Sequence, residues 1–357
     1  MHKSHTAAPR PQLQRYLVAG YVLFIVYVSL SPFVGWQEQG LYFVDVLTAP
    51  LSQTFTWFDA ILNSVSYLPL GFLLAYMLRR HLPWTHVFLI ATLAGLFLSL
   101  SMEYAQLYLP SRVSSNSDLL SNSIGACCGA TLALTISEYA WFSNLESWHD
   151  KWFHRKKFSD FGMALVALWM FAQTNPSLPM LGSVFVGEIA RWPFDIVPAT
   201  PFNWQESAGV ALNLLLLGIL LSTLLRERRH TVYAMLMVLC AVILVKFIAA
   251  AILLKSWALL VWLNSEAIMG IIAGLLLLVT AMRLTLNWSI VAGAIAAVLY
   301  FLRVQDLLFG TPSSAVMRLF HWHYMHMLNY NGLSKFVIFL FPVLLLGYLI
   351  RTGLQRK

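Results

Sequence analysis

Residues 60–108 read AILNSVSYLPLGFLLAYMLRRHLPWTHVFLIATLAGLFLSLSMEYAQLY and contain two long apolar runs, 60–78 and 86–108. A helix needs about 20 apolar residues to cross the hydrocarbon core of a bilayer, and both runs meet this length. The loop that joins them carries Arg79 and Arg80, which is typical of the cytoplasmic side of a membrane protein. The stretch therefore predicts two antiparallel transmembrane helices.

The same pattern continues along all 357 residues, of which 59% are hydrophobic and 11% are charged, with a mean hydropathy of +0.71. Soluble domains average about 25% charged residues. The composition therefore excludes a soluble globular enzyme, a disordered chain and a coiled coil. It predicts an all-α fold, a polytopic transmembrane helical bundle of about ten spans. The predicted spans are residues 16–35, 60–78, 86–108, 118–140, 161–175, 207–225, 232–254, 257–281, 285–302 and 335–351.

The placement of Lys and Arg predicts the orientation of these spans. The chain has 23 Lys and Arg against 15 Asp and Glu, a net charge of +8, and most of the basic residues fall in the loops on the side of the N-terminus. Basic residues collect in cytoplasmic loops, so we expect both termini to be cytoplasmic and the loop with Arg112 to face outward. The predicted location is the inner, or cytoplasmic, membrane, with multiple passes.

The chain also resembles itself when it is shifted by 147 residues. Asp59 then falls opposite Glu206, and a shift of 145 aligns two Gly-x-x-x-Gly patterns. This echo predicts an internal duplication in which the two copies run parallel through the membrane. In the same alignment Glu103 falls opposite Ala250, so we expect the second copy to lack the polar set described next. The aligned residues other than leucine include Pro32 with Pro179, Gly35 with Gly182, Trp57 with Trp204, Gly71 with Gly218, Gly125 with Gly270 and Gly129 with Gly274.

Polar residues gather in 101–129, which reads SMEYAQLYLPSRVSSNSDLLSNSIGACCG. Glu103 lies inside an apolar run, where an unpaired charge costs about 2.5–3.5 kcal/mol or more, so it marks a functional or structural site. Gln106 shares its helix face, and Pro110 is expected to end the helix. Ser114, Ser117 or Asp118 is expected to cap the next helix.

These residues are predicted to converge near the outer membrane surface on three helices. Arg112 is expected to bridge Glu103 and Asp118 through forked hydrogen bonds, while Asn63, Gln106 and Asn122 satisfy the remaining polar atoms. Two interpretations stay open at this point: a polar pocket that faces the cell envelope, or a network that only clips three helices together.

The spacing of this set resembles the signature of the VanZ-like family of bacterial membrane proteins over about residues 20–140. Leu70 is a departure, because an aromatic residue is common there in the family. The residues that carry the resemblance are Asn63, Pro69, Gly71, Glu103, Gln106, Pro110, Arg112, Ser115, Asp118, Asn122, Gly125 and Gly129. The resemblance implies a protein of the bacterial cell envelope. The family is named for a protein that gives low-level resistance to the glycopeptide antibiotic teicoplanin, and its members are often associated with surface polysaccharide. The resemblance implies no defined reaction.

Three hypotheses for function follow. In the first, the chain binds or processes a lipid-linked or saccharide substrate of the envelope at the outer leaflet. Its catalytic candidates are Glu103 and Asp118, and its substrate-binding candidates are Asn63, Gln106, Arg112, Ser115 and Asn122. The second is a non-enzymatic scaffold or accessory factor for envelope polysaccharide assembly. The third is a transporter of a lipid substrate, motivated by the duplication and by two further intramembrane charges.

Those two charges are Lys246 and Glu266, which we expect to form a structural ion pair between neighbouring helices. The remaining structural candidates are Pro69, Gly71, Pro110, Gly125 and Gly129. A second cluster, with His321, His323 and His326, is interpreted as an aromatic segment on the outer surface rather than a metal site. No nucleotide, flavin or haem signature occurs, so we expect no cofactor and no metal.

The predicted organisation has five parts. Residues 1–15 form a cytoplasmic tail and 16–140 the VanZ-like transmembrane domain. Residues 141–160 form a basic cytoplasmic loop, 161–281 a second transmembrane half that is a degenerate repeat, and 282–357 the C-terminal helices. Membrane lipids are the expected partners, together with envelope polysaccharide or peptidoglycan machinery, and nucleic acid is not expected.

Overall fold

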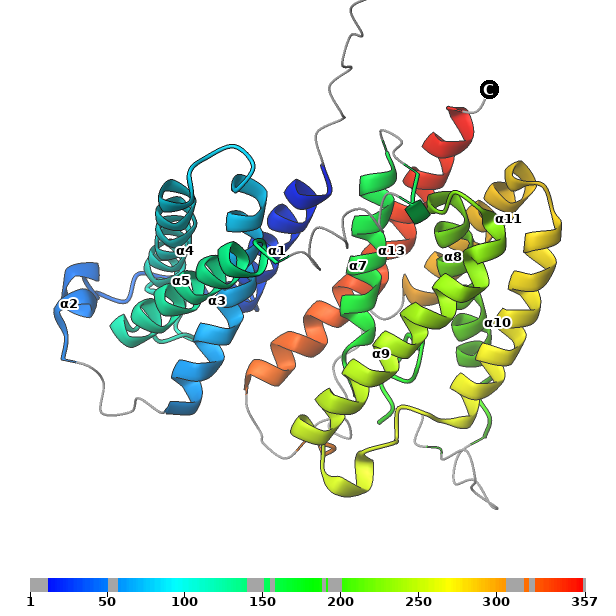
Figure 1. The fold of residues 1–357 in the computed structure, drawn as a ribbon. Helices are drawn as coiled ribbons and strands as arrows, with labels where there is room; N and C mark the ends of the chain where they lie inside the picture. Colours follow the sequence, from blue (N-terminus) through cyan, green and yellow to red (C-terminus); the bar gives the residue numbers. More distant parts are fainter. Residues whose placement is uncertain are drawn as a thin grey trace, which may run out of the picture. The chain divides into compact units, whose positions relative to one another are not determined.

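The computed structural model describes residues 12–50, 57–139, 151–154, 158–187, 191, 201–305, 318–320 and 325–355. The chain divides into two compact units, Met1–Asp150 and Lys151–Lys357. The division falls within the predicted basic loop. Helices dominate both units (Figure 1), and each unit is described by itself below.

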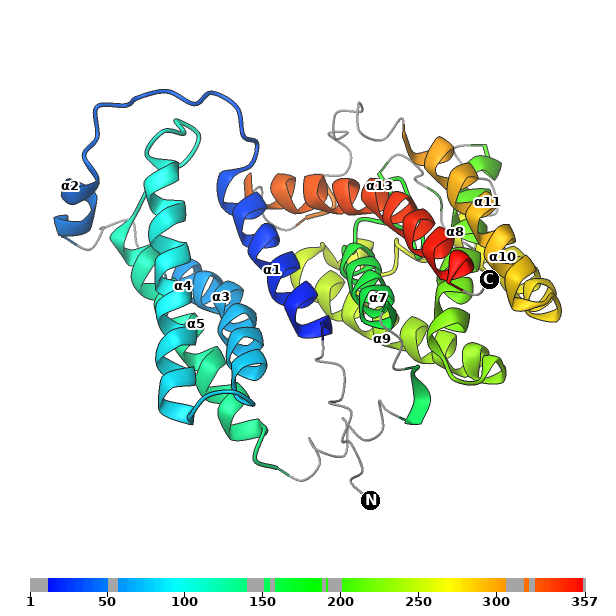
Figure 2. The same cartoon turned by 90° about the horizontal axis from the view of Figure 1, so that it is seen from above.

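The N-terminal unit is built from four long helices and one short one. The helices are α1 (Leu13–Leu30), α2 (Phe43–Thr48), α3 (Trp57–Leu78), α4 (Trp84–Gln106) and α5 (Asn116–Ile136). Helix α3 packs against α1, α4 and α5, and Figure 2 shows α3, α4 and α5 side by side. Because the long helices alternate in direction, the end of α1, the start of α3, the end of α4 and the start of α5 share one end of the unit.

Three glycines let α3 and α5 approach closely. A Cβ atom on Gly71 would clash with the backbone carbonyl of Ala126, and Cβ atoms on Gly125 and Gly129 would clash with the carbonyls of Ser64 and Leu68. Small residues at a helix interface allow such backbone contact in a membrane, where dispersion contacts replace the hydrophobic driving force. Pro69 is accommodated inside α3. The glycine stripe thus packs α3 along α5.

The C-terminal unit surrounds one buried helix. Its helices are α7 (Ser159–Gln173), α8 (Trp204–Leu224), α9 (Thr231–Leu253), α10 (Ser265–Arg283), α11 (Leu286–Val304) and α13 (Met325–Leu354), with short 3-10 turns at Arg228–His230 and Ser256–Ala258. Helix α8 contacts α7, α9, α10 and α11. Within its apolar window 89% of the residues are buried, against 22% for α9, so α8 is the core of this unit.

Nine helices of the described residues are long and apolar enough to cross a membrane. Helix α7 is the exception among the predicted spans, because its 15 residues rise only about 22 Å at about 1.5 Å per residue. Among the boundaries that differ from the prediction, the starts of α10 and α13 move furthest. Helix α10 begins at Ser265 because Asn264 caps it, its Oδ1 accepting from the Ala267 amide at 2.9 Å. Helix α13 begins at Met325, ten residues before the predicted start.

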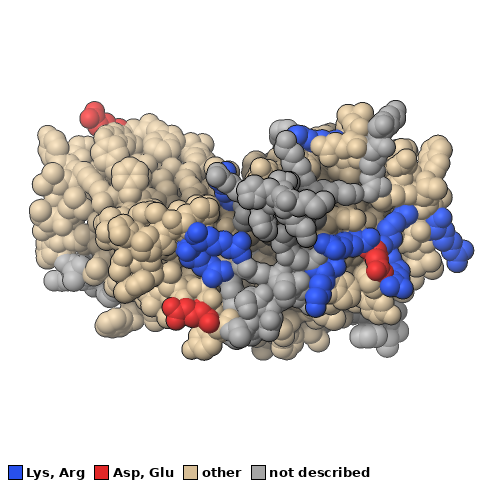
Figure 3. All heavy atoms as spheres, turned by 45° about the horizontal axis from the view of Figure 1, so that its top comes forward, with Lys and Arg blue, Asp and Glu red and all other residues tan. Residues whose placement is uncertain are grey.

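The surface fits a multi-pass membrane protein. Large apolar side chains such as Phe97 (75% exposed) and Leu276 (65% exposed) lie outward, and uncharged atoms make up most of the face in Figure 3. Lys and Arg cover more of that face than Asp and Glu do.

His321 and His323, on which the histidine cluster depends, lie outside the described residues.

Candidate functional site

Glu103, near the end of α4, is the most buried acid among the described residues of the N-terminal unit, with 4% of its surface exposed. Its Oε2 accepts hydrogen bonds from the Ser115 amide at 2.7 Å and from the Ser114 hydroxyl at 3.0 Å. The chain turns after Gln106, and Pro110 lies in the turn beyond the helix, so the following loop folds back over the carboxylate. The predicted helix end before Pro110 is therefore confirmed.

Ser115 links this carboxylate to helix α5. It is the N-cap residue of α5, and its hydroxyl accepts from the Ser117 amide at 3.2 Å while its own amide donates to Glu103. The prediction that Ser114, Ser117 or Asp118 caps α5 is therefore wrong. Ser115 is the cap residue because its extended backbone leaves its amide free to donate to Glu103.

Arg112 does not bridge Glu103 and Asp118, so that prediction is wrong. Its Nη2 donates to the carbonyl of Val28 at 2.9 Å and to that of Ser31 at 2.8 Å. The last carbonyls of a helix lack partners within the helix and carry the negative end of its dipole. The end of α1 therefore attracts the guanidinium. Burial lowers the pKa of Arg112, and the two carbonyls compensate for part of the lost hydration.

Gln106 contacts the same end of α1. Its Nε2 donates to the Ser29 carbonyl at 3.0 Å. Gln106 and Arg112 together join the α4–α5 loop to the last turn of α1, and we call these two residues with the carbonyls of Val28, Ser29 and Ser31 the α1 clamp. Sequence reasoning grouped Gln106 and Arg112 with the carboxylates, whereas the structure separates them.

The second group is the carboxylate cluster, which we define as Asn63, Tyr67, Ser99, Glu103, Asp118 and Asn122. The Asn63 side chain lies within hydrogen-bonding reach of the Asp118 carboxylate, and Asp118 in turn lies near Glu103. The Asn122 amide donates to the Ser99 hydroxyl at 2.9 Å. Helices α3, α4 and α5 thus each contribute polar side chains, as the sequence predicts for Asn63, Glu103, Asp118 and Asn122.

Tyr67 has the least satisfied polar atom of this cluster. The residue is 4% exposed, and its hydroxyl approaches Ser99, Glu103 and Asp118 but forms no well-aligned hydrogen bond within the described residues. Sequence reasoning missed both Tyr67 and Ser99. A signal existed, because Ser99 lies four residues before Glu103 and Tyr67 lies four residues after Asn63 on their helices.

The two acids of the cluster, Glu103 and Asp118, are held by neutral hydrogen-bond donors. No Lys or Arg of the described residues forms an ion pair with Glu103 or Asp118, and Asp59 adds a third carboxylate close to Asp118. Carboxylates, amides and hydroxyls in this arrangement accept hydrogen bonds from hydroxyl or ammonium groups. Within the searched residues no group of three or more His, Cys, Asp or Glu has a metal-binding arrangement.

Lys246 and Glu266 do not pair, so the predicted ion pair of the C-terminal unit is wrong. The Lys246 Nζ donates to the carbonyls of Asn175 at 2.9 Å and Leu178 at 2.8 Å. Glu266 lies 3.8 Å from Arg191, measured between Oε1 and Nη1. Matching depth in the membrane was the only basis for the prediction, and depth does not determine which way a side chain points around its helix.

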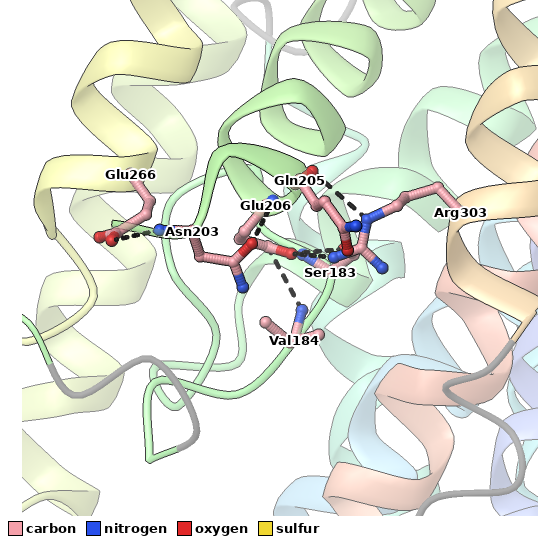
Figure 4. A network of polar contacts seen from close by, with 7 residues as sticks. All are labelled: Ser183, Val184, Asn203, Gln205, Glu206, Glu266 and Arg303. Carbon is pink, nitrogen blue, oxygen red and sulfur yellow. Dashed lines mark hydrogen bonds and ion pairs between the residues drawn. The ribbon is translucent and has the colours of Figure 1, made fainter. Parts of the chain in front are cut away.

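Glu206 is a second buried acid of this unit that sequence reasoning noted only in the alignment with Asp59. Its carboxylate is fully buried and accepts from the Ser183 amide at 2.6 Å and the Ser183 hydroxyl at 3.0 Å (Figure 4). Arg303 lies 3.6 Å from its Oε2. Asn203 connects the two acids, since its side chain accepts from the Glu206 amide and its own amide donates to Glu266.

The fold and these buried polar contacts define a multi-pass helical membrane protein. Residues 11–137 match the model of the VanZ/LLP1 family, so the N-terminal unit contains a VanZ-like domain. This region covers the α1 clamp and the carboxylate cluster, whereas the helices of the C-terminal unit lie beyond it. No curated protein and no solved structure matches the chain.

Proposed function

We propose that the VanZ-like domain binds a polar substrate of the cell envelope, a lipid-linked or free saccharide, at the outer surface of the cytoplasmic membrane. One observation carries the proposal: the carboxylates of Glu103 and Asp118 lie near each other at one end of the unit, and neither forms an ion pair with a described Lys or Arg. Carboxylates held in place by the protein are suitable acceptors for sugar hydroxyls.

The other cluster residues have supporting roles in this proposal. Asn63 orients Asp118, and the Ser114 and Ser115 donors orient Glu103. The α1 clamp holds α1 in place, so Arg112 and Gln106 act as positioning residues and not as the substrate-binding residues that the sequence predicts. If the domain is an enzyme, Glu103 is the candidate general acid or base.

A scaffold is the second candidate, favoured by the α1 clamp. Two of the signature residues, Gln106 and Arg112, donate their hydrogen bonds to backbone carbonyls of α1. Such contacts join helices, and they give Gln106 and Arg112 a structural role and not a chemical one. The transporter interpretation loses one of its two supports, since Lys246 and Glu266 do not pair.

Substitutions that remove charge and keep shape separate these functions. The full-length protein would be purified with Glu103→Gln, with Asp118→Asn and, as matched control, with Glu138→Gln, an exposed acid beyond α5. Mass spectrometry would measure the co-purified saccharide lipid, and thermal melting would measure stability. We expect the first two changes to reduce binding about tenfold or more, equivalent to about 1.4 kcal/mol, at unchanged abundance.

Two results would contradict the proposal. Unchanged saccharide binding in both variants at normal abundance would show that the carboxylates do not contact substrate. Loss of abundance and melting temperature in both, with no saccharide bound by the wild-type protein, would favour the scaffold.

A further inference from the structure

The two units share a four-helix arrangement, although the family match covers only the first unit. A shift of 147 residues places α3 on α8 and α4 on α9, and the shifted α4 begins and ends at the same residues as α9. The same shift places α1 on α7 and α5 on α10 to within a few residues. The packing agrees in part: α4 lies against α5 in the first unit, whereas α9 has no comparable contact with α10 among the described residues. Helix α1 contacts α3 and α4 as α7 contacts α8 and α9, and α3 lies against α5 as α8 lies against α10.

In each unit one cation contacts backbone carbonyls at the end of the first helix or in the segment that follows it. Arg112 donates to the carbonyls of Val28 and Ser31, and Lys246 donates to those of Asn175 and Leu178. Val28 and Asn175 are 147 positions apart, and so are Ser31 and Leu178. The cation itself comes from different places, a loop in one unit and the middle of α9 in the other. The second unit therefore keeps this contact although the aligned sequence has lost the arginine.

Acids also lie at the same end of both units, one pair related by the same shift and the other by 148 positions. Glu206 lies 147 positions after Asp59, near the start of α8 and of α3, and Glu266 occupies the first turn of α10 as Asp118 occupies that of α5. In the second unit both carboxylates are fully buried, and each has a guanidinium of the same chain nearby. Figure 4 shows Arg303 directed at the Glu206 carboxylate.

The first unit lacks this occupant at Asp118. The carboxylate forms no ion pair with a described Lys or Arg, and the Tyr67 hydroxyl, buried beside it, has no well-aligned hydrogen-bond partner in the described part of the chain. A buried hydroxyl without a well-aligned partner is unfavourable, because it has lost its hydrogen bonds to water. Both observations point to a ligand that brings a cationic hydrogen-bond donor.

We infer that residues 159–283 are a second copy of the VanZ-like four-helix unit, in which Arg191 and Arg303 of the same chain occupy the acidic site. In the first unit an external ligand takes the place of these arginines. The carboxylate cluster binds a guanidinium or primary ammonium group of that ligand. This inference rests on the proposed function and narrows its substrate to one with a cationic nitrogen, such as an amino sugar or an aminated lipid headgroup.

Methylguanidinium is the probe for this site. The full-length protein would be placed in nanodiscs of phosphatidylglycerol, which has no ammonium group, and binding would be measured by saturation-transfer NMR. We expect saturable binding that N-methylurea, the neutral analogue of similar shape, does not show. Asp118→Asn should weaken binding about tenfold, whereas the control Glu138→Gln should not.

The source of the cationic group is tested in a parallel arm with phosphatidylethanolamine nanodiscs. Weaker methylguanidinium binding there supports the inference with a lipid headgroup as ligand, and unchanged binding supports it with a soluble amine.

Equal binding of N-methylurea, or no methylguanidinium binding by the wild type, overturns the inference even if Asp118→Asn does not fold. If saccharide capture still depends on Glu103 and Asp118 in that case, the proposed function stands without it.

Discussion

At the residue scale, backbone carbonyls compete with carboxylates for the cations of this protein. Arg112 and Lys246 both lie in units with buried acids, yet both donate to backbone carbonyls, Arg112 at the end of α1 and Lys246 in the segment after α7. Those carbonyls have no helical partner and are fixed in position by the backbone. A carboxylate can instead be satisfied by amides and hydroxyls, as Ser114 and Ser115 do for Glu103.

Replacing Arg112 with Met should lower the free energy of unfolding by about 1.5–3 kcal/mol, the usual contribution of a hydrogen bond to a charged group. Arg112→Lys should recover part of this loss, since an ammonium also donates to carbonyls. Melting in detergent would measure both, with the exposed Arg283→Met as control. A wild-type melting curve for Arg112→Met would mean that the α1 clamp contributes nothing.

Exchanging the charges of Lys246 and Glu266 should not restore stability. Each single change, Lys246→Glu or Glu266→Lys, puts an unsuitable charge at a fully buried position, which costs several kcal/mol. Because the two side chains have different partners, the double variant should be no more abundant than the weaker single variant. Rescue by the double variant, measured by membrane abundance, would show that the residues do pair.

At the element scale, glycines determine how closely α3 and α5 pack, and this contact brings Asn63 next to Asp118. The carbonyls of Ser64 and Leu68 occupy the space that side chains at Gly125 and Gly129 would need. The spacing of the glycines predicts a helix contact, and the structure identifies α3 as the partner.

Gly129→Ala should therefore destabilise the N-terminal unit by about 1–3 kcal/mol through overpacking. Gly20→Ala is the matched control, because a Cβ at Gly20 meets no atom within 4 Å and alanine favours the helix. Thermal melting would compare the two variants. Equal melting temperatures would show that α5 moves away from α3 without penalty.

At the scale of the whole molecule, each unit has its own buried core. Ala75, Ala91 and Ala130 pack together in the first unit, and the buried face of α8 forms the centre of the second. Residues 1–150 and 151–357, each expressed without the other, should therefore insert and fold. Protease resistance of each fragment in membranes would measure this, and degradation of either fragment when expressed without the other would contradict it.

Sequence patterns alone determined the helical membrane fold, most helix positions and the VanZ-like signature. These properties follow from local periodicity and from hydrophobicity, which each segment carries by itself. Only the tertiary structure decided the partners of the polar side chains. Arg112, Lys246 and Glu266 each have several possible partners at the same depth, and the choice depends on helix rotation and on the direction of backbone carbonyls, which hydropathy does not encode.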